Sequence, residues 1–447
     1  MMINESILLL TYYYHSELRN HRLLKYIGKN HLGAYLPWDM YLYKPLRKVF
    51  SKVILYDYLE RMTEIGVKAV NEEIIALVRR EHPKYVLWVS WQYDIHESTL
   101  ETIRKEGVIV VGWFFDDEWR FNDYSRWWIP YLDYCVTNAI SAVPKYRRLG
   151  ARVIQTIPNT GIAIARDWSR TEERYDVSFV GGRNFIDREQ YLDRLSKSGI
   201  KVDLFGQDWG GYVSFSKMID IIQTSKINLN FSKAISYDQP RQLKGRLFQV
   251  CLAGGFMLTE YAPGTENYFE IDKEIVCFED TEEMIAKVRY YLCHDEERRA
   301  IAQAGWERAT REHTSSRMVA RVFEQIEQDI AVNGRSDNDS SQELKMPFLV
   351  RRIAASYHFE WGRILLEENY KRSLWKDELE LSLSYTTTHF STWYYKVAGL
   401  FPPSLRSPLL ELYGVIERFL MNLCGRLRTI IWLRKLKATV INKMLHA

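Results

Sequence analysis

The stretch Leu243-Lys-Gly-Arg-Leu-Phe-Gln-Val-Cys-Leu-Ala-Gly-Gly-Phe-Met-Leu-Thr-Glu260 indicates the fold of this 447-residue chain most directly. Two basic residues, Lys244 and Arg246, precede an apolar helix-like segment, which runs into a pair of glycines and a short strand-like segment. Backbone N–H groups and the helix dipole favour anions at the start of a helix. The order therefore predicts a helix, a glycine turn and a buried strand, with a site for a phosphorylated ligand where the helix begins.

Short apolar runs alternate with helix-like segments along most of the chain. Strands are expected at 6–12, 52–56, 85–90, 108–115, 134–137 and 153–157, and again at 176–180, 201–205, 226–231, 255–259 and 274–277. Continuous apolar strands separated by helices are typical of a parallel sheet covered on both faces. We expect an α/β protein with two facing Rossmann-like domains that bind ligands in the cleft between them.

Composition suggests where these domains begin and end. A polar, turn-rich segment follows residue 157, a spacer of disordered type lies around 333–342, and the remainder is mostly helical in pattern. We predict a first Rossmann-like domain at 1–160, a linker at 161–175, a second Rossmann-like domain at 176–332, a flexible spacer at 333–343 and a helical C-terminal extension at 344–447.

Charge and cysteine usage exclude several classes of protein. With 61 basic and 57 acidic residues the formal charge is +4, so a nucleic-acid partner is not expected. The five cysteines are scattered and include no Cys-x-x-Cys pair, which favours a reducing, cytoplasmic location over a disulfide framework or structural zinc. No signal peptide or membrane-spanning run is expected, and the P-loop, zincin and serine-hydrolase motifs are missing.

The last part of the chain is basic and amphipathic. Residues 420–447 carry six Lys or Arg side chains and no acid, beside a broad apolar face. Such a helix can lie on an anionic membrane surface, which would make the protein peripheral to a membrane. The alternative is a helix that packs on its own protein or on a partner.

The second half contains another strand that runs into glycines and a cation. Val177-Ser-Phe-Val-Gly-Gly-Arg183 has this pattern, with Arg183 after Gly182, and Arg188 opens the next helix. Glycines let backbone amides approach a ligand, and Arg pairs with phosphate in bidentate fashion. Taken alone, this segment is interpreted as a simple strand–helix turn. Several such strand ends can lie at one edge of a parallel sheet, and together they favour a site for a phosphate-bearing ligand.

Spaced motifs over 176–318 resemble the C-terminal half of the CgeB-like, group 1 type glycosyltransferases of the GT-B fold. The first half matches only loosely. The resemblance rests on Ser178-Phe-Val-Gly, Phe205-Gly-x-x-Trp209, Ile227-Asn-Leu-Asn-Phe231, Leu243-Lys-Gly-Arg-x-Phe248, Ala253-Gly-Gly-x-x-Leu-Thr-Glu260, Tyr268-Phe-Glu270 and His313-Thr-x-x-Arg317.

The resemblance implies a nucleotide diphosphate sugar held by the second domain, with the hydroxyl acceptor mostly on the first. Lys244 and Arg246 would neutralise the leaving diphosphate, with help from Arg183 or Arg188. Gln249 stands where related enzymes often place a Glu that holds the donor ribose.

Four further residues complete the predicted donor site: Gly182, Gly254, Gly255 and Glu260. Gly254 and Gly255 are expected to act as tight-turn or close-approach glycines. Glu260 is an alternative donor contact, and a solvated acid at the end of a strand is the plainer interpretation.

In the first half, three acids end a buried strand, and we rank Asp116 and Asp117 first as the base. Adjacent carboxylates raise one another's pKa, which suits a base that takes a proton from an acceptor hydroxyl. The alternative is a helix cap by either residue. Asp94 with His96, and His15, are rival bases.

The prediction is therefore a glycosyltransferase of the hexosyltransferase type, with no cofactor or metal, that acts on a cell-surface or lipid-linked glycan. Two alternatives stay open: a non-catalytic protein of the same fold that binds nucleotide sugars or serves assembly, and a sugar-nucleotide epimerase.

Overall fold

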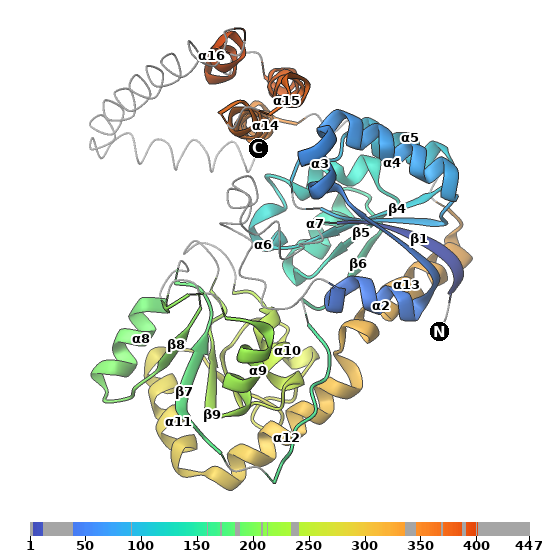
Figure 1. Cartoon of the computed structure of the whole chain (residues 1–447). Coiled ribbons are helices and arrows are strands. Elements are labelled where there is room, and N and C mark those ends of the chain that lie inside the picture. The colour runs from blue at the N-terminus through green and yellow to red at the C-terminus, as the bar shows by residue number, and fades with distance from the viewer. Residues whose placement is uncertain are drawn as a thin grey trace.

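A computed structural model of the chain shows two α/β domains and a helical extension (Figure 1). It describes residues 3–11, 39–90, 92–158, 160–169, 172–183, 188–206, 209–211, 213–233, 241–335, 346–367, 370–386, 390–398 and 400.

The first domain is built on a six-stranded sheet in the order β2-β1-β3-β4-β5-β6, with all neighbouring strands parallel. The strands are β1 Ile3–Thr11, β2 Phe50–Asp57, β3 Tyr85–Val89, β4 Ile109–Phe114, β5 Tyr134–Thr137 and β6 Val153–Gln155. The helices are η2 Asp39–Tyr43, α2 Lys44–Val49, α3 Tyr58–Ile65, α4 Val67–Glu81, α5 Glu97–Lys105, α6 Asp117–Arg120, η3 Ser125–Tyr131, η4 Ile140–Ala142 and α7 Val143–Arg148. The strand order reverses beside β1, which is where doubly wound sheets bind ligands.

The second domain has a five-stranded parallel sheet in the order β11-β10-β9-β7-β8. Its strands are β7 Tyr175–Val180, β8 Asp203–Phe205, β9 Ser225–Asn230, β10 Met257–Glu260 and β11 Val276–Phe278. Its helices are α8 Arg188–Lys197, α9 Phe215–Gln223, α10 Gly245–Leu252, η6 Thr265–Asn267, α11 Thr281–Cys293 and α12 Asp295–Glu312. All eleven expected strands are present, and the predicted fold class is confirmed.

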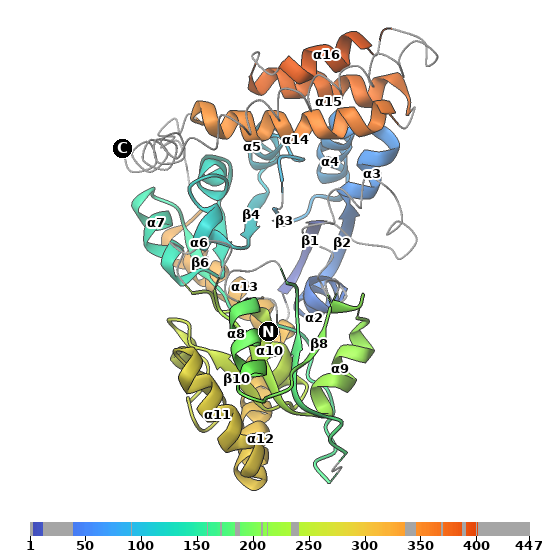
Figure 2. The same ribbon diagram turned by 90° about the vertical axis from the view of Figure 1, so that its left-hand side faces the viewer.

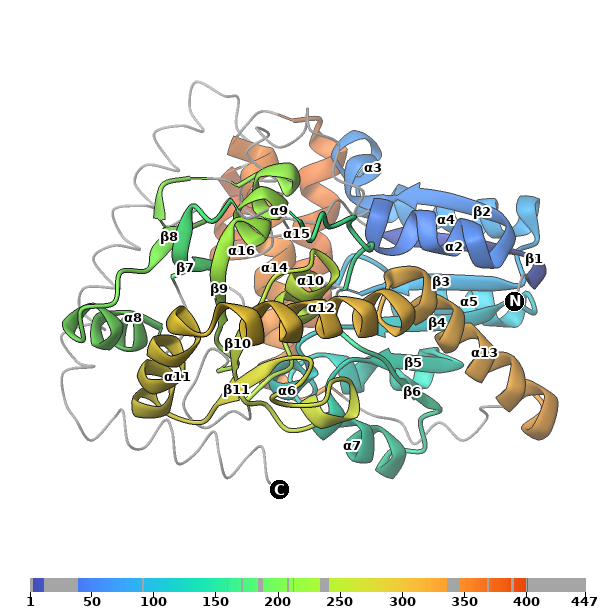
Figure 3. The same cartoon turned by 90° about the horizontal axis from the view of Figure 1, so that it is seen from below.

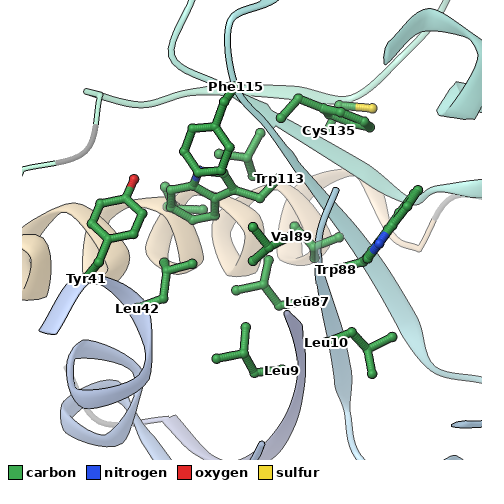
Figure 4. Packing of buried hydrophobic residues seen from close by; sticks show 14 of the residues in the cluster. Leu9, Leu10, Tyr41, Leu42, Leu87, Trp88, Val89, Trp113, Phe115 and Cys135 are labelled. Atoms are coloured by element: carbon green, nitrogen blue, oxygen red, sulfur yellow. The ribbon is translucent and has the colours of Figure 1, made fainter. Parts of the chain in front are cut away.

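Apolar strands form the core of the first domain because both faces of its sheet are covered. Trp88 of β3 and Trp113 of β4 are fully buried. Tyr41, which precedes α2, points toward Phe115 and Trp113 at the end of β4 (Figure 4), with the Tyr41 and Phe115 ring centroids 6.2 Å apart. This packing fixes the carboxyl end of β4, where the acids 116–118 follow.

Helix α13, Ser315–Asn333, carries the chain from the second domain back to the first. It continues the direction of α12 and reaches β5 and β6 (Figure 3), and it packs against α2. Glu327 accepts hydrogen bonds from Lys84 at 2.8 Å and Tyr85 at 2.6 Å. The expected boundary at residue 332 assigns this helix to the second domain, whereas these contacts lie with the first.

The helical extension lies over the first domain (Figure 2). It comprises α14 Phe348–Glu367, α15 Arg372–Tyr385 and α16 Phe390–Ala398. A side chain at Gly66, before α4, would meet Leu374 Cδ2 at 2.9 Å, so glycine permits α15 to approach closely. Among the described residues, no helix has the length and apolarity to cross a membrane. The basic segment 420–447 lies outside them.

Candidate functional site

The loop before α10 joins the two domains through a chain of polar side chains. Lys244 stands at the N-cap of α10 and donates a hydrogen bond to Gln242 Oε1. Gln242 Nε2 in turn donates to Glu118 Oε2 of α6, at 2.8 Å. Gln242 is only 4% exposed. Helices α6 and α10 lie on the facing sides of the two domains (Figure 2), so this chain of contacts places a cation of one domain beside acids of the other.

Burial and mutual charge shift the pKa values of both ends of this chain. The pKa of Glu118 is raised to about 7, mainly by burial and also by the charge of Asp116, while a backbone hydrogen bond, Gln242 and Lys244 act in the opposite direction. The pKa of Lys244 is lowered to about 8, mainly by burial and also by the charge of Arg188, while the acids Asp116 and Glu118 act in the opposite direction. Both groups therefore titrate near neutral pH, which is typical of functional sites.

Asp116 adopts a left-handed backbone conformation, with φ 59° and ψ 30°. It occupies the N-cap position of α6, but its side chain makes no capping hydrogen bond. The capping role considered above is therefore not what the structure shows for Asp116. A non-glycine residue at positive φ costs free energy, and such residues cluster at functional sites.

Asp117 is fully buried and serves as an acceptor for three hydroxyl groups. Thr137 and Tyr146 donate to Oδ2 at 2.7 and 2.8 Å, and Ser125 donates to Oδ1. Both carboxylate oxygens are thus used to connect α6 to η3, β5 and α7. This geometry favours a structural role for Asp117, in place of the expected role as a base.

Glu260 is also engaged within the protein. Its Oε2 accepts the backbone N–H groups of Ser232 and Lys233 at 2.9 and 3.2 Å, and its Oε1 accepts the Tyr191 hydroxyl at 3.0 Å. Arg241 Nε lies 3.3 Å from the same oxygen. Glu260 therefore holds the ends of β9 and β10 together, instead of standing as a solvated acid.

The two arginines after β7 have different surroundings. Arg188 is 7% exposed, donates to the Gly182 carbonyl at 2.6 Å and lies near enough to lower the pKa of Lys244. Arg183 is exposed, ion-paired with Glu189, and its guanidinium lies 5.2 Å from the centroid of the Trp209 ring. Of the two, Arg188 is the one beside the start of α10.

Helix α10 carries two more of the predicted donor residues. Arg246 lies in its first turn, partly buried, with Nη1 in contact with the Met218 sulfur of α9. Gln249 lies in the next turn and is also partly buried. Both therefore follow Lys244 along the same helix.

Gly254 and Gly255 lie at the other end of α10, in the turn that leads into the amino end of β10. Gly254 has φ 74°, and a Cβ there would meet Arg166 Cγ at 2.9 Å. A Cβ on Gly255 would meet Ile222 Cγ2 at 2.6 Å. These glycines let the turn between α10 and β10 pack against Arg166 and against Ile222 of α9. The turn lies at the sheet edge opposite Lys244, so the structure favours a packing role for them over a role in a donor site.

The rival base Asp94 is buried beneath the helical extension, and His96 is partly buried. Asp94 is fully buried and accepts a hydrogen bond from the Tyr357 hydroxyl of α14. Burial lowers the pKa of His96 to about 4. The third rival, His15, lies outside the described residues. No group of three or more His, Cys, Asp or Glu side chains suited to a metal ion occurs in the described ranges.

Glu118 and Gln242 are absent from the predicted site residues. Glu118 belongs to the acidic run 116–118, and this run does indicate a functional role in the sequence. No sequence pattern indicates a functional role for Gln242, because a lone glutamine in a loop is usually solvated.

Comparison with known proteins finds one family that matches part of the second domain and the start of α13. Residues 183–324 match the family described as Glycosyl transferase-like, which confirms the predicted glycosyltransferase in its general form. No protein of curated function matches the chain.

Similar solved structures are of low identity. HepE of Anabaena in complex with UDP-glucose is 11% identical with a TM-score of 0.49, covering 73% of this chain and 100% of that one. Sucrose-phosphate synthase of Thermosynechococcus elongatus is 9% identical with a TM-score of 0.48, covering 74% and 100%. A glycosyltransferase of Rickettsia africae is 10% identical with a TM-score of 0.45, covering 74% and 99%.

Proposed function

We propose that this chain, whose residues 183–324 form a glycosyl transferase-like domain, transfers a sugar from a nucleotide diphosphate sugar to a hydroxyl acceptor. The observation that carries the proposal is the bridge from Lys244 through Gln242 to Glu118. It places a cation at a helix start directly opposite a carboxyl group with a pKa of about 7. Transfer needs both a site for a leaving diphosphate and a base for an incoming hydroxyl.

The donor diphosphate would bind at the start of α10. Lys244 and the first N–H groups of this helix supply positive charge there, and Arg246 and Arg188 lie close by. Negative charge grows on the leaving diphosphate as the bond to the sugar breaks, so fixed cations stabilise the transition state more than the ground state. A bound diphosphate also favours the charged form of Lys244.

The base would be Glu118, with Asp116 beside it. A carboxyl group with a pKa of about 7 is poised to accept a proton at neutral pH. The acceptor hydroxyl gives its proton to Glu118 as its oxygen bonds to the sugar carbon, and the bond from that carbon to the diphosphate breaks. Asp116 would act through its charge, which raises the pKa of Glu118.

A thermal-shift screen over nucleoside diphosphates and their sugars tests the donor site, because ligands that bind the folded state raise the melting temperature. We expect at least one diphosphate to raise it. A screen in which no nucleotide shifts the melting temperature would favour the non-catalytic alternative. Conversion of the donor sugar without release of free nucleotide would instead indicate the epimerase.

Finer assignments rest on the sequence. The motif spacing over 176–318 supports a CgeB-like transferase of the hexosyltransferase type. Cytoplasmic placement is supported by four free cysteines in the described ranges: Cys135, Cys251, Cys277 and Cys293. The basic segment 420–447 supports attachment to an anionic membrane surface, and hence a lipid-linked or cell-surface glycan as acceptor. Vesicle binding that is as tight after neutralisation of its six basic residues as before would rule out a contribution from this segment.

A further inference from the structure

The first two turns of α14 expose apolar and basic side chains together. Phe348, Leu349 and Ile353 are 48%, 46% and 50% exposed, and they are three of the eight large hydrophobic side chains that are exposed in the described ranges. Arg351 and Arg352, between them, are exposed as well. We call these five residues the α14 patch.

The α14 patch occupies the outward side of the helix. Because successive residues of an α-helix are turned by about 100°, its members cover one arc. Val350 and Ala354 lie on the remaining, inward side of the helix and are buried. Neither arginine forms an ion pair with any residue that the structure describes. The α14 patch thus combines exposed apolar surface with positive charge that the described part of the protein does not neutralise.

Helix α14 is fixed to the first domain. The Tyr357 hydroxyl binds the buried Asp94 carboxylate, and the Tyr93 and Tyr357 ring centroids are 6.4 Å apart. His358 Nδ1 lies 2.9 Å from Glu378 Oε2 of α15, with both side chains buried. Burial lowers the pKa of His358 to about 4 and raises the pKa of Glu378. Whatever the α14 patch binds is therefore held at the domain that carries Glu118.

We infer that the α14 patch docks on the surface of an anionic lipid bilayer. Apolar side chains that enter the boundary between headgroups and acyl chains, beside arginines that meet anionic headgroups, are the composition of interfacial helices. Charge complementarity selects an anionic surface. The inference depends on the proposed function in one respect: it identifies the hydroxyl acceptor as a membrane-bound one, presented to the first domain.

Two signals would then act together. A single weak interfacial contact gives reversible binding, and stable attachment takes two. The α14 patch is one signal and the basic segment 420–447 is the other. The experiment therefore has to separate them, and it does so in the full-length chain.

The test is flotation of the full-length protein with phosphatidylcholine vesicles, with and without phosphatidylglycerol. The α14 patch is removed by a Phe348→Ser, Leu349→Ser, Ile353→Ser triple variant and, separately, by an Arg351→Gln, Arg352→Gln double variant. Each is made in the natural chain and in a parent whose six C-terminal cations are glutamine: Arg426, Arg428, Arg434, Lys435, Lys437 and Lys443.

Matched controls lie away from the α14 patch. Val332→Ser removes an apolar side chain that is 81% exposed on α13. Lys371→Gln with Arg372→Gln removes two exposed charges at the start of α15. We expect binding to phosphatidylglycerol vesicles to fall on the order of tenfold or more in each patch variant and to stay unchanged in both controls.

Three results would overturn the inference. One is anionic-vesicle binding that is equal in the patch variants and their parents, or absent from all of them. Another is equal binding to neutral and anionic vesicles. The third is a dimer that the triple variant splits into monomers without loss of vesicle binding, since the patch would then be an interface between copies. Thermal shifts with nucleoside diphosphates, measured on the same variants, test the donor site independently of vesicle binding. Failure of one proposal can therefore be distinguished from failure of the other.

Discussion

Gln242 Nε2 of the second domain donates a hydrogen bond of 2.8 Å to Glu118 Oε2 of the first. The same Gln242 side chain accepts a hydrogen bond from Lys244 through its carbonyl oxygen. One buried amide thus connects the proposed donor cation to the proposed base. Groups so connected influence each other's protonation, and that influence can be measured.

Glu118→Gln should lower kcat/KM by roughly 10²–10⁴, because the acceptor hydroxyl loses its base. In the natural protein kcat/KM should rise with pH through about 7, as Glu118 loses its proton. It should fall above about 8, as Lys244 loses its charge. A pH–rate profile measures both limbs. The exposed Glu101→Gln is the control, and a Glu118→Gln variant that keeps the acidic limb would exclude Glu118 as the base.

Two neighbours of Glu118 should move the acidic limb in opposite directions. Asp116→Asn removes a negative charge that raises the pKa of Glu118, so the limb should shift to lower pH. Gln242→Leu removes a donor to the carboxylate, so the limb should shift to higher pH. Side chains with only structural roles would lower the rate without either shift. Shifts of the same sign in both variants would contradict the bridge.

Asp117 and Asp116 should differ in their effect on stability. Asp117→Ala leaves three buried hydroxyls without their acceptor and should cost roughly 2–4 kcal/mol in the free energy of unfolding. Asp116→Asn should cost less than about 1 kcal/mol, because asparagine tolerates the left-handed conformation. Chemical denaturation measures both. Comparable losses in the two variants would argue against the separation of roles.

Gly254→Ala and Gly255→Ala test whether the glycine turn serves packing or the donor. Each substitution should destabilise the second domain by about 1–3 kcal/mol, because a Cβ would overlap Arg166 or Ile222 and Gly254 has a positive φ. Nucleoside diphosphate affinity, measured by titration calorimetry below the melting temperature, should stay within about threefold of the natural value. A large loss of affinity with unchanged stability would return these glycines to the donor site.

The sheets could be predicted from the sequence because their strands are buried on both faces. Runs such as Tyr85–Val89 and Ile109–Phe114 are continuously apolar, and the intervening helices are amphipathic. In each parallel sheet the carboxyl ends of the strands meet at one edge, and doubly wound domains bind ligands there. Lys244 in the second domain and the acids 116–118 in the first could therefore both be predicted as parts of a functional site.

The remaining features depend on contacts between distant parts of the chain. Tyr357 reaches Asp94, and Glu327 reaches Tyr85, across more than 240 residues of sequence. No local pattern indicates that α13 and the helical extension return to the first domain and bury a rival base. The structural roles of Asp117 and Glu260 could not be predicted for a related reason. The sequence does not show which buried groups donate hydrogen bonds to a carboxylate, so each of these acids was expected to act on a substrate.

The central claim is that the start of α10 holds the diphosphate of a nucleotide sugar, and donor turnover in a Lys244→Ala, Arg246→Ala variant tests it most directly. Release of free nucleoside diphosphate is measured over a panel of donors, with Lys197→Ala, an exposed lysine of α8, as the control. We predict turnover of at least one donor by the natural chain and by the control, and a loss of roughly 10²-fold or more in the double variant. Turnover that is undiminished in a folded double variant, or absent from the natural chain for every donor, would contradict the account.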